Sequence, residues 1–367
     1  MTRILEYDGL RGWLLIIIAC NHLYGSFVSD FTRAPFGFVS AAEAFVFLSG
    51  FVAYFVYQRL DVTPVNQTNK ILLRTLTIYG FHLFAITVTF TLVAIFPYYQ
   101  TLWTEFFLVG NFFTSPIQFS FATFFLLEHP GYHDILIMYL VAMAFLPMAM
   151  ASLKKDRWLL VLITSITLWF IAPFLELTLF SELYHTLFPV LTIQVSTFDP
   201  LAWQLYFYFG VLLSYAKFNR KIPFDFNPLI KWILFTCTLL LMLGKHAQVS
   251  WLQSLIQNSG NAPVLMIINL LLLCYVFSFW MRKWPYLFTL KYPVLLGQHA
   301  LPVFSFHTIV VYFLLPITYE YTNATWYWDI AACTLFVGLL WLPAKLDYLF
   351  HQTKKQRQAV AKTITSN

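Results

Sequence analysis

Three polar side chains occur in or at the end of the first hydrophobic segment of the chain: Asp8, Arg11 and His22. A cation and an imidazole inside hydrocarbon are costly to keep there, so they usually mark a functional site. A neutral imidazole can take a proton from a hydroxyl group near neutral pH, whereas a guanidinium group pairs with phosphate or carboxylate oxygens. On one helix, Arg11 and His22 lie about 16 Å apart. The spacing predicts an anion-binding residue and a base at different depths of the same helix.

Three further titratable side chains occupy predicted spans, namely Glu43, His82 and His307. At a rise of about 1.5 Å per residue, all three reach depths between the midplane and the outer third of the bilayer, as His22 does. We therefore expect four groups from four spans to converge at this level. A carboxylate such as Glu43 could orient the His22 imidazole and stabilise its protonated form.

Each of these residues also has a structural interpretation, which the sequence leaves open. His82 can hydrogen-bond a neighbouring carbonyl group, and Glu43 can bond to another helix. Arg11 can extend to a lipid phosphate while its aliphatic part stays in the apolar layer.

Two clusters of polar and aromatic residues enter predicted spans from the outer end and could line the mouth of a site: His133, Asp134 and Tyr139, and Asp199, Trp203 and Gln204. The two aspartates are equally good candidates for helix N-caps. In the second span, the pair Ser49-Gly50 is more typical of close helix packing than of chemistry.

The composition determines the class of protein. Of 367 residues, 60% are hydrophobic and 10% are charged, and the mean hydropathy is +0.70. Soluble domains carry about 25% charged residues, so the chain is an all-α polytopic membrane protein. We expect no disulfide and no metal cluster, because all four cysteines fall in apolar segments: Cys20, Cys237, Cys274 and Cys333.

The hydropathy pattern predicts about ten transmembrane helices, near residues 10–28, 38–58, 71–96, 134–153, 158–176, 200–216, 228–244, 262–281, 292–316 and 326–344. Three outer connections, 97–133, 177–199 and 317–326, contain no Lys or Arg, whereas the basic clusters fall on the other side. The positive-inside rule therefore places both termini in the cytoplasm. The same distribution accounts for the net charge of +6 without nucleic-acid binding.

Residues 104–127 are apolar enough to span once, but one more span would invert every later connection against the charge bias. We expect re-entrant or interfacial helices there on the outer side, and residues 178–196 look similar. The chain divides into a single transmembrane domain, 1–350, and a short basic cytoplasmic tail, 351–367.

A series of motifs from residue 8 to residue 307 resembles the OpgC family, within the wider group of transmembrane acyltransferases. The second-span motif is the most specific of them. The matching residues are Asp8-Gly-Leu-Arg11-Gly with His22, Ala41-Ala-Glu43-Ala-Phe-Val-Phe-Leu-Ser49-Gly50, Asp134-Ile-Leu-Ile-Met-Tyr139, Asp199-Pro-Leu-Ala-Trp203-Gln204, and Gly297-Gln-His299-Ala-Leu-Pro302-Val-Phe-Ser305-Phe-His307.

The namesakes of that family attach succinyl groups to osmoregulated periplasmic glucans. The resemblance implies that cytoplasmic acyl-CoA is the donor and that a periplasmic hydroxyl is the acceptor. It also implies that His22 is the catalytic histidine and Arg11 a donor-side residue. Asn21 stands where many members have aspartate, and Gly9-Leu10 replaces a more usual aromatic pair. These departures leave the two roles intact but bear on the identity of donor and acceptor.

We therefore expect a multi-pass enzyme of the bacterial inner membrane that binds acyl-CoA and a periplasmic glucan or other saccharide, with the lipid bilayer as its surroundings. No permanently bound cofactor and no metal are expected. Arg11 and Arg74 would pair with CoA phosphates at the inner mouth. His22 and Glu43 are the expected catalytic residues, and the expected donor- or substrate-binding residues are Asp8, Arg11, Ser49, Arg74, His82, Asp134, Tyr139, Trp203, Gln204 and His307.

Two other functions stay open at this point. The acceptor could be another surface or lipid-linked saccharide, with acetyl-CoA as a possible donor, because related sites serve many acceptors. A secondary transporter is the less favoured alternative, since transporters commonly carry internal repeats and none is found here. The sequence also leaves open whether transfer is direct or passes through an acylated His22.

Overall fold

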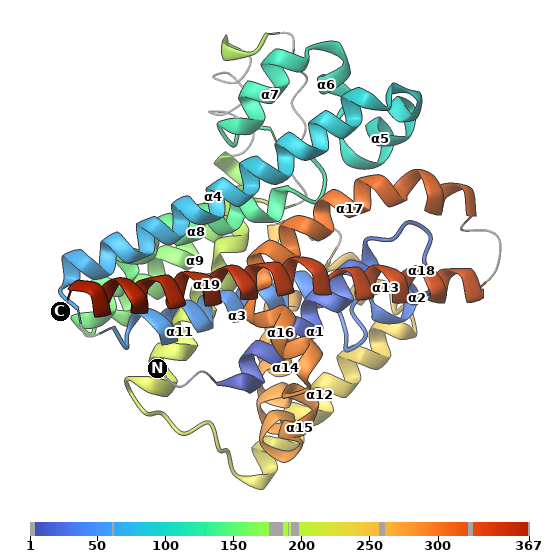
Figure 1. Ribbon diagram of the computed structural model, residues 1–367. Helices are drawn as coiled ribbons and strands as arrows, with labels where there is room; N and C mark the ends of the chain where they lie inside the picture. Colours follow the sequence, from blue (N-terminus) through green and yellow to red (C-terminus); the bar gives the residue numbers. More distant parts are fainter. Residues whose placement is uncertain are drawn as a thin grey trace. The chain divides into compact units, whose positions relative to one another are not determined.

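The computed structural model describes residues 4–60, 62–128, 130–175, 186–189, 191, 198–256, 261–321 and 326–365. Every regular element in this part of the chain is a helix (Figure 1). The chain forms two compact units, one made of residues 1–33 with 280–367 and the other of residues 34–279. Each unit is described separately below.

The first unit contains both ends of the chain. Its helices are α1 (Leu5–Asn21), α2 (Phe27–Thr32), α15 (Pro285–Phe288), α16 (Lys291–Gln298), α17 (Ala300–Tyr321), α18 (Trp326–Leu339) and α19 (Trp341–Thr365). The second unit holds α3 (Ala41–Tyr57), α4 (Pro64–Ile95), η1 (Pro97–Tyr99), α5 (Gln100–Phe107), α6 (Gly110–Thr114), α7 (Pro116–Phe124), α8 (Asp134–Lys154), α9 (Trp158–Leu175), α11 (Pro200–Phe218), α12 (Pro228–His246), α13 (Ser250–Ser254) and most of α14 (Val264–Lys283).

The described residues include seven stretches that are long and apolar enough to cross a membrane, which makes the chain a multi-pass membrane protein. They are Pro64–Ile95, Asp134–Lys154, Trp158–Leu175, Pro228–His246, Val264–Lys283, Ala300–Glu320 and Trp326–Lys354. The all-α membrane fold is thus confirmed. The count of ten spans, the orientation, and the division into one domain and a tail stay predictions.

Several predicted boundaries were wrong, each for a local reason. The predicted span 292–316 is two helices, because α16 ends at Gln298 and α17 begins at Ala300. Pro302 lies in the first turn of α17, where a missing N–H is tolerated. The predicted span 71–96 begins earlier, at Pro64, with the Thr63 hydroxyl accepting a hydrogen bond as N-cap.

The apolar region 104–127 is not one long helix. It forms short helices, α5, α6 and α7, whose connections include Leu108 in a left-handed conformation. These short helices agree with the expectation that the region does not form an additional transmembrane span. Most of residues 178–196 lie outside the described part of the chain.

In the first unit, α1 and α16 touch backbone to backbone, side by side in Figure 1. A Cβ atom on Gly12 would lie 1.8 Å from the Pro293 carbonyl oxygen, and one on Gly297 would lie 1.7 Å from that of Asp8. A Cβ on Gly9 would lie 1.7 Å from the Phe288 carbonyl oxygen. Only glycine allows this approach, as small residues do in other membrane helix pairs.

The second unit repeats this device where α3 crosses α11. A Cβ atom on Gly50 would lie 1.9 Å from the Phe207 carbonyl oxygen, and one on Gly210 would lie 2.0 Å from that of Phe47. The packing interpretation of Ser49-Gly50 therefore agrees with the position of Gly50. Helices α8 and α9 pack against α11, and α4 packs against α8.

The glycine contact yields a test. We expect Gly297→Ala to force α1 and α16 apart and to lower stability by about 1–3 kcal/mol, as overpacking typically does. The measurement is the thermal unfolding midpoint and the folded yield in detergent. Gly338→Ala, in α18 of the same unit, is the matched control because a Cβ there would meet nothing within 4 Å. Equal behaviour of the two variants would contradict the account of the contact.

Candidate active site

The first unit brings together two of the histidines singled out by the sequence. His22 caps the C-terminal end of α1, and His307 lies in the third turn of α17. Nδ1 of His22 is 2.7 Å from Nε2 of His307, and the rings stack with centroids 4.9 Å apart. His307 is buried and His22 is half-buried. The two side chains therefore form one hydrogen-bonded pair, the histidine dyad.

The backbone sets the direction of the hydrogen bond in this dyad. Nδ1 of His307 lies 2.8 Å from the carbonyl oxygen of Phe304, which can only accept, so Nδ1 carries the hydrogen. In neutral His307, Nε2 is then an acceptor, and Nδ1 of His22 must be the donor. This tautomer follows from the hydrogen-bond network. It leaves the lone pair of neutral His22 on Nε2, which is the atom that can take a proton.

This arrangement matches the role of an orienting group in a catalytic triad. When His22 gains a proton on Nε2, its Nδ1–H still donates to Nε2 of His307. The sequence had suggested Glu43 for this role and substrate binding for His307. In the structure, His307 is hydrogen-bonded to His22.

The turn after His22 is held by α18. Asp329 accepts hydrogen bonds at Oδ2 from Ser26 Oγ at 3.0 Å and from the Val28 backbone N–H at 3.2 Å. Val28 lies in the first turn of α2, where backbone N–H groups have no partner within the helix. Asp329 therefore supplies the cap that the N-cap residue Ser26 does not make with its own side chain.

The same face of α18 covers the dyad. Cys333 Sγ lies 3.4 Å from Ser26 Oγ, and the Phe336 ring packs 6.3 Å from that of His307. Residues 329, 333 and 336 follow the helical repeat, so they share one face. At the other end of α2, Thr32 Oγ1 donates to Asn21 Oδ1 at 2.5 Å. The backbone on both sides of His22 is thus tied to its neighbours.

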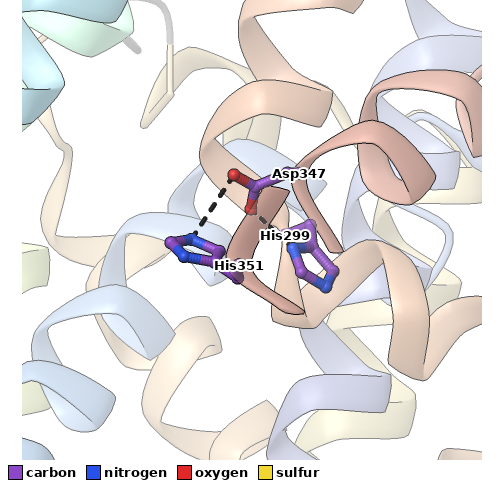
Figure 2. Close-up of polar contacts among 3 residues, drawn as sticks. All are labelled: His299, Asp347 and His351. Carbon is purple, nitrogen blue, oxygen red and sulfur yellow. Dashed lines mark hydrogen bonds and ion pairs between the residues drawn. The ribbon is translucent and has the colours of Figure 1, made fainter. Parts of the chain in front are cut away.

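A second imidazole site lies near the α1–α16 crossing. His299 occupies the break between α16 and α17, with Nδ1 2.6 Å from Asp347 Oδ2 on α19. Figure 2 shows Asp347 between His299 and His351, whose Nε2 is 3.5 Å from Asp347 Oδ1. His299 is buried and His351 is exposed. His299 is part of one of the sequence motifs, but the sequence predicted no role for it, because its partner Asp347 lies 48 residues away.

Asp8 and Arg11 lie at this same end of the first unit. Both are half-buried on α1, and the backbone of Asp8 and Gly12 touches Gly297, two residues before His299. From there to the dyad, α1 rises about 16 Å from Arg11 and α17 about 12 Å from His299. The unit therefore has two polar ends, one with Arg11 and His299 and the other with the dyad.

In the second unit, Glu43 belongs to the N-terminal cap of α3. Its Oε2 accepts hydrogen bonds from the Ser40 backbone N–H at 2.8 Å and from Ser40 Oγ at 2.5 Å, while Ala42 N–H donates to Ser40 Oγ. This is a capping box, and the spacing Ser40-x-x-Glu43 was readable in the sequence. These contacts give the buried carboxylate a structural role.

His82 and Asp134 occupy the α4–α8 part of this unit. His82 is fully buried, with its ring 6.4 Å from that of His133, and Thr89 Oγ1 is 3.3 Å from His133 Nε2. Asp134 begins α8 and accepts from the Ile135 N–H. Tyr139, one turn later on α8, packs its ring 5.8 Å from that of Phe207.

The residues expected near the start of α11 also have contacts inside the unit. Gln204 accepts from Ser165 Oγ at 2.7 Å and donates to the Ser165 carbonyl at 2.8 Å, which joins α9 to α11. Trp203 is buried and packs 4.4 Å from Phe198. Asp199 caps α11 by accepting from Leu201 N–H at 2.8 Å, which agrees with the N-cap interpretation.

Burial raises the pKa of the Asp199 carboxyl group, and hydrogen bonds from backbone N–H groups partly oppose this effect. Ser49 is buried beside Gly50, whereas Arg74 is exposed on α4. Within the described residues, no group of three or more His, Cys, Asp or Glu side chains is arranged to hold a metal ion.

Comparison with known proteins gave one match. A family model described as OpgC protein matches residues 3–352. No curated protein and no solved structure matches the chain.

The cap on α2 can be tested by substitution. Asp329→Ala removes the acceptor for Ser26 and Val28, and we expect a loss of about 1–3 kcal/mol in stability together with faster proteolysis between residues 22 and 33. The measurement is limited proteolysis followed by mass spectrometry. Asp30→Ala, at an exposed position in α2 itself, serves as the control. If the two variants are cleaved at the same rate, the cap does not hold this turn.

Proposed function

The chain belongs to the OpgC family, and on this basis we propose that it is a membrane-bound O-acyltransferase that moves a succinyl group from cytoplasmic acyl-CoA to a hydroxyl group of a periplasmic glucan. The family implies acyl transfer, while the donor, the acceptor and the location in the bacterial inner membrane belong to the proposal. The observation that carries it is the histidine dyad, in which the lone pair of neutral His22 is on Nε2.

The dyad suits the chemistry of this transfer. As the acceptor oxygen attacks the thioester carbonyl carbon, its proton passes to Nε2 of His22, and a carbon–oxygen bond forms. The tetrahedral intermediate then collapses, the carbon–sulfur bond breaks, and His22 returns the proton to the departing CoA thiolate. His307 accepts from Nδ1–H of His22 throughout and stabilises the imidazolium between the two steps. The products are the ester and the CoA thiol, with no net proton released.

The distance along the first unit fits a donor as long as CoA. Arg11 lies about 16 Å along α1 from His22. A guanidinium group there can pair bidentately with a phosphate of the donor while the thioester reaches the dyad. We assign Arg11 to this donor end, with Asp8 one turn away on the same helix.

An anionic acyl group also fits the charge near the dyad. Arg33 is the C-cap of α2, in the same unit as His22. Its charge would attract the distal carboxylate of a succinyl group, which an acetyl group lacks. This favours succinyl over acetyl donors in the proposal.

The decisive experiment uses cells that lack this protein and are complemented with the wild type or with His22→Ala. We expect the mass of one succinyl group on the periplasmic glucans with the wild type, and a fall of at least about 10³-fold with His22→Ala, because general acid–base catalysis is lost. The measurement is mass spectrometry of the isolated glucans. Membrane insertion of both proteins is checked by immunoblotting.

Purified protein given succinyl-CoA or acetyl-CoA then tests the donor. Glucans of equal mass in all strains would contradict the succinylglucan proposal. Release of CoA thiol to a different saccharide would keep acyl transfer and replace the acceptor. Substrate flux without consumption of thioester would indicate a transporter instead.

A further inference from the structure

Two tyrosines lie just beyond the histidine dyad. Tyr24 follows His22 by two residues, and its ring centroid lies 5.4 Å from that of Tyr319 on α17, with an angle of 36° between the rings. Tyr24 is 37% exposed and Tyr319 is 47% exposed. Between His22 and Tyr24, Leu23 is buried, and Gly25 adopts a left-handed conformation that ends the turn. The chain therefore turns at this point so that the Tyr24 ring is exposed.

The tyrosine pair lies on the side of the dyad away from the donor end. Tyr319 comes twelve residues after His307, which is about 18 Å further along α17 from the α1–α16 crossing. Two residues of chain span at most about 7 Å, so the backbone of Tyr24 remains close to that of His22. The two rings therefore lie at the end of the unit opposite Arg11 and His299.

The chemistry of these rings suits a sugar. A pyranose has a face of C–H groups that packs on an aromatic ring, and an edge of hydroxyl groups that needs polar partners. Tyrosine offers both, a large rigid apolar ring and a phenolic hydroxyl at its tip. Binding sites of this kind combine aromatic walls with a few polar groups that fix orientation.

We propose that Tyr24 and Tyr319 form the acceptor rim, a binding site on which a sugar ring of the acceptor stacks while one of its hydroxyl groups reaches Nε2 of His22. This inference rests on the proposed acyl transfer and gives the saccharide its binding residues. Nothing in the motifs that resemble the family includes either tyrosine.

Exposed aromatic residues in a membrane protein also serve as interfacial anchors. Trp326, Tyr327 and Trp328, at the start of α18, have this character, since they are more than half exposed and their rings contact one another along the chain. Tyr24 and Tyr319 differ because two segments far apart in sequence bring them together, and one of these segments directly follows His22. Tyr327 therefore provides a control of the same residue type in the same unit.

The test compares steady-state kinetics of purified wild type, Tyr24→Ala, Tyr24→Phe, Tyr319→Ala and Tyr327→Ala, with succinyl-CoA as donor and a gluco-oligosaccharide as acceptor. We expect each Ala variant at the rim to raise KM for the oligosaccharide about tenfold while KM for succinyl-CoA stays unchanged. Tyr24→Phe keeps the ring and should stay within about twofold to threefold of the wild type. A purely structural role would change both KM values or the yield of folded protein.

The inference is overturned if Tyr24→Ala and Tyr319→Ala change KM for the oligosaccharide no more than Tyr327→Ala does. If the wild type transfers no acyl group to any saccharide, the proposed function fails. The acceptor rim is then tested by whether the protein binds the gluco-oligosaccharide. Binding of the gluco-oligosaccharide would then be measured by the change in tyrosine and tryptophan fluorescence. Binding by the wild type that is lost in Tyr24→Ala supports the rim, and no binding by the wild type refutes it.

Discussion

The close contact between α1 and α16 is the constraint on which the rest of the first unit depends. Gly12 of α1 and Gly297 of α16 let backbone atoms approach to distances that no side chain would allow. This contact restrains the position of α1 and its rotation about its axis, and α1 carries His22 at its C-terminal end. From the crossing, α1 and α17 both lead to the dyad, where Nδ1 of His22 meets Nε2 of His307. The packing contact at one end of the unit thus lies about 12–16 Å along these helices from the dyad.

In the proposed mechanism, a neutral imidazole takes the place of the carboxylate of a triad. An ionised carboxylate can accept a hydrogen bond from His22 at either oxygen. A neutral imidazole accepts one only at the ring nitrogen that carries no hydrogen. The carbonyl of Phe304 removes this ambiguity by holding the hydrogen on Nδ1 of His307. At the opposite end of the unit, the partner of an imidazole is a carboxylate, because Nδ1 of His299 pairs with Asp347.

The sequence predicts the class of fold and the depth of the polar groups, but not their partners. Hydropathy identified the apolar helices, and helical rise placed His22 and His307 at similar levels, where they lie side by side. Depth alone could not show that Glu43 bonds to Ser40, although the spacing of a capping box carries that signal. The break before α17 also escaped prediction, because a glycine such as Gly297 is tolerated inside a helix pattern. Asp329 could not be found, since its partners lie about 300 residues earlier and only the tertiary fold brings them together.

The central claim is that His307 acts as the acceptor that orients His22. The most direct measurement is the rate of acyl transfer by His307→Gln and His307→Leu, at saturating donor and acceptor. The amide oxygen of Gln can take the place of Nε2 and accept from Nδ1–H of His22, whereas Leu fills the space without an acceptor. The account predicts that His307→Gln stays within about tenfold of the wild type and that His307→Leu falls by about 10²–10³-fold. A His307→Leu enzyme as active as the wild type would contradict it.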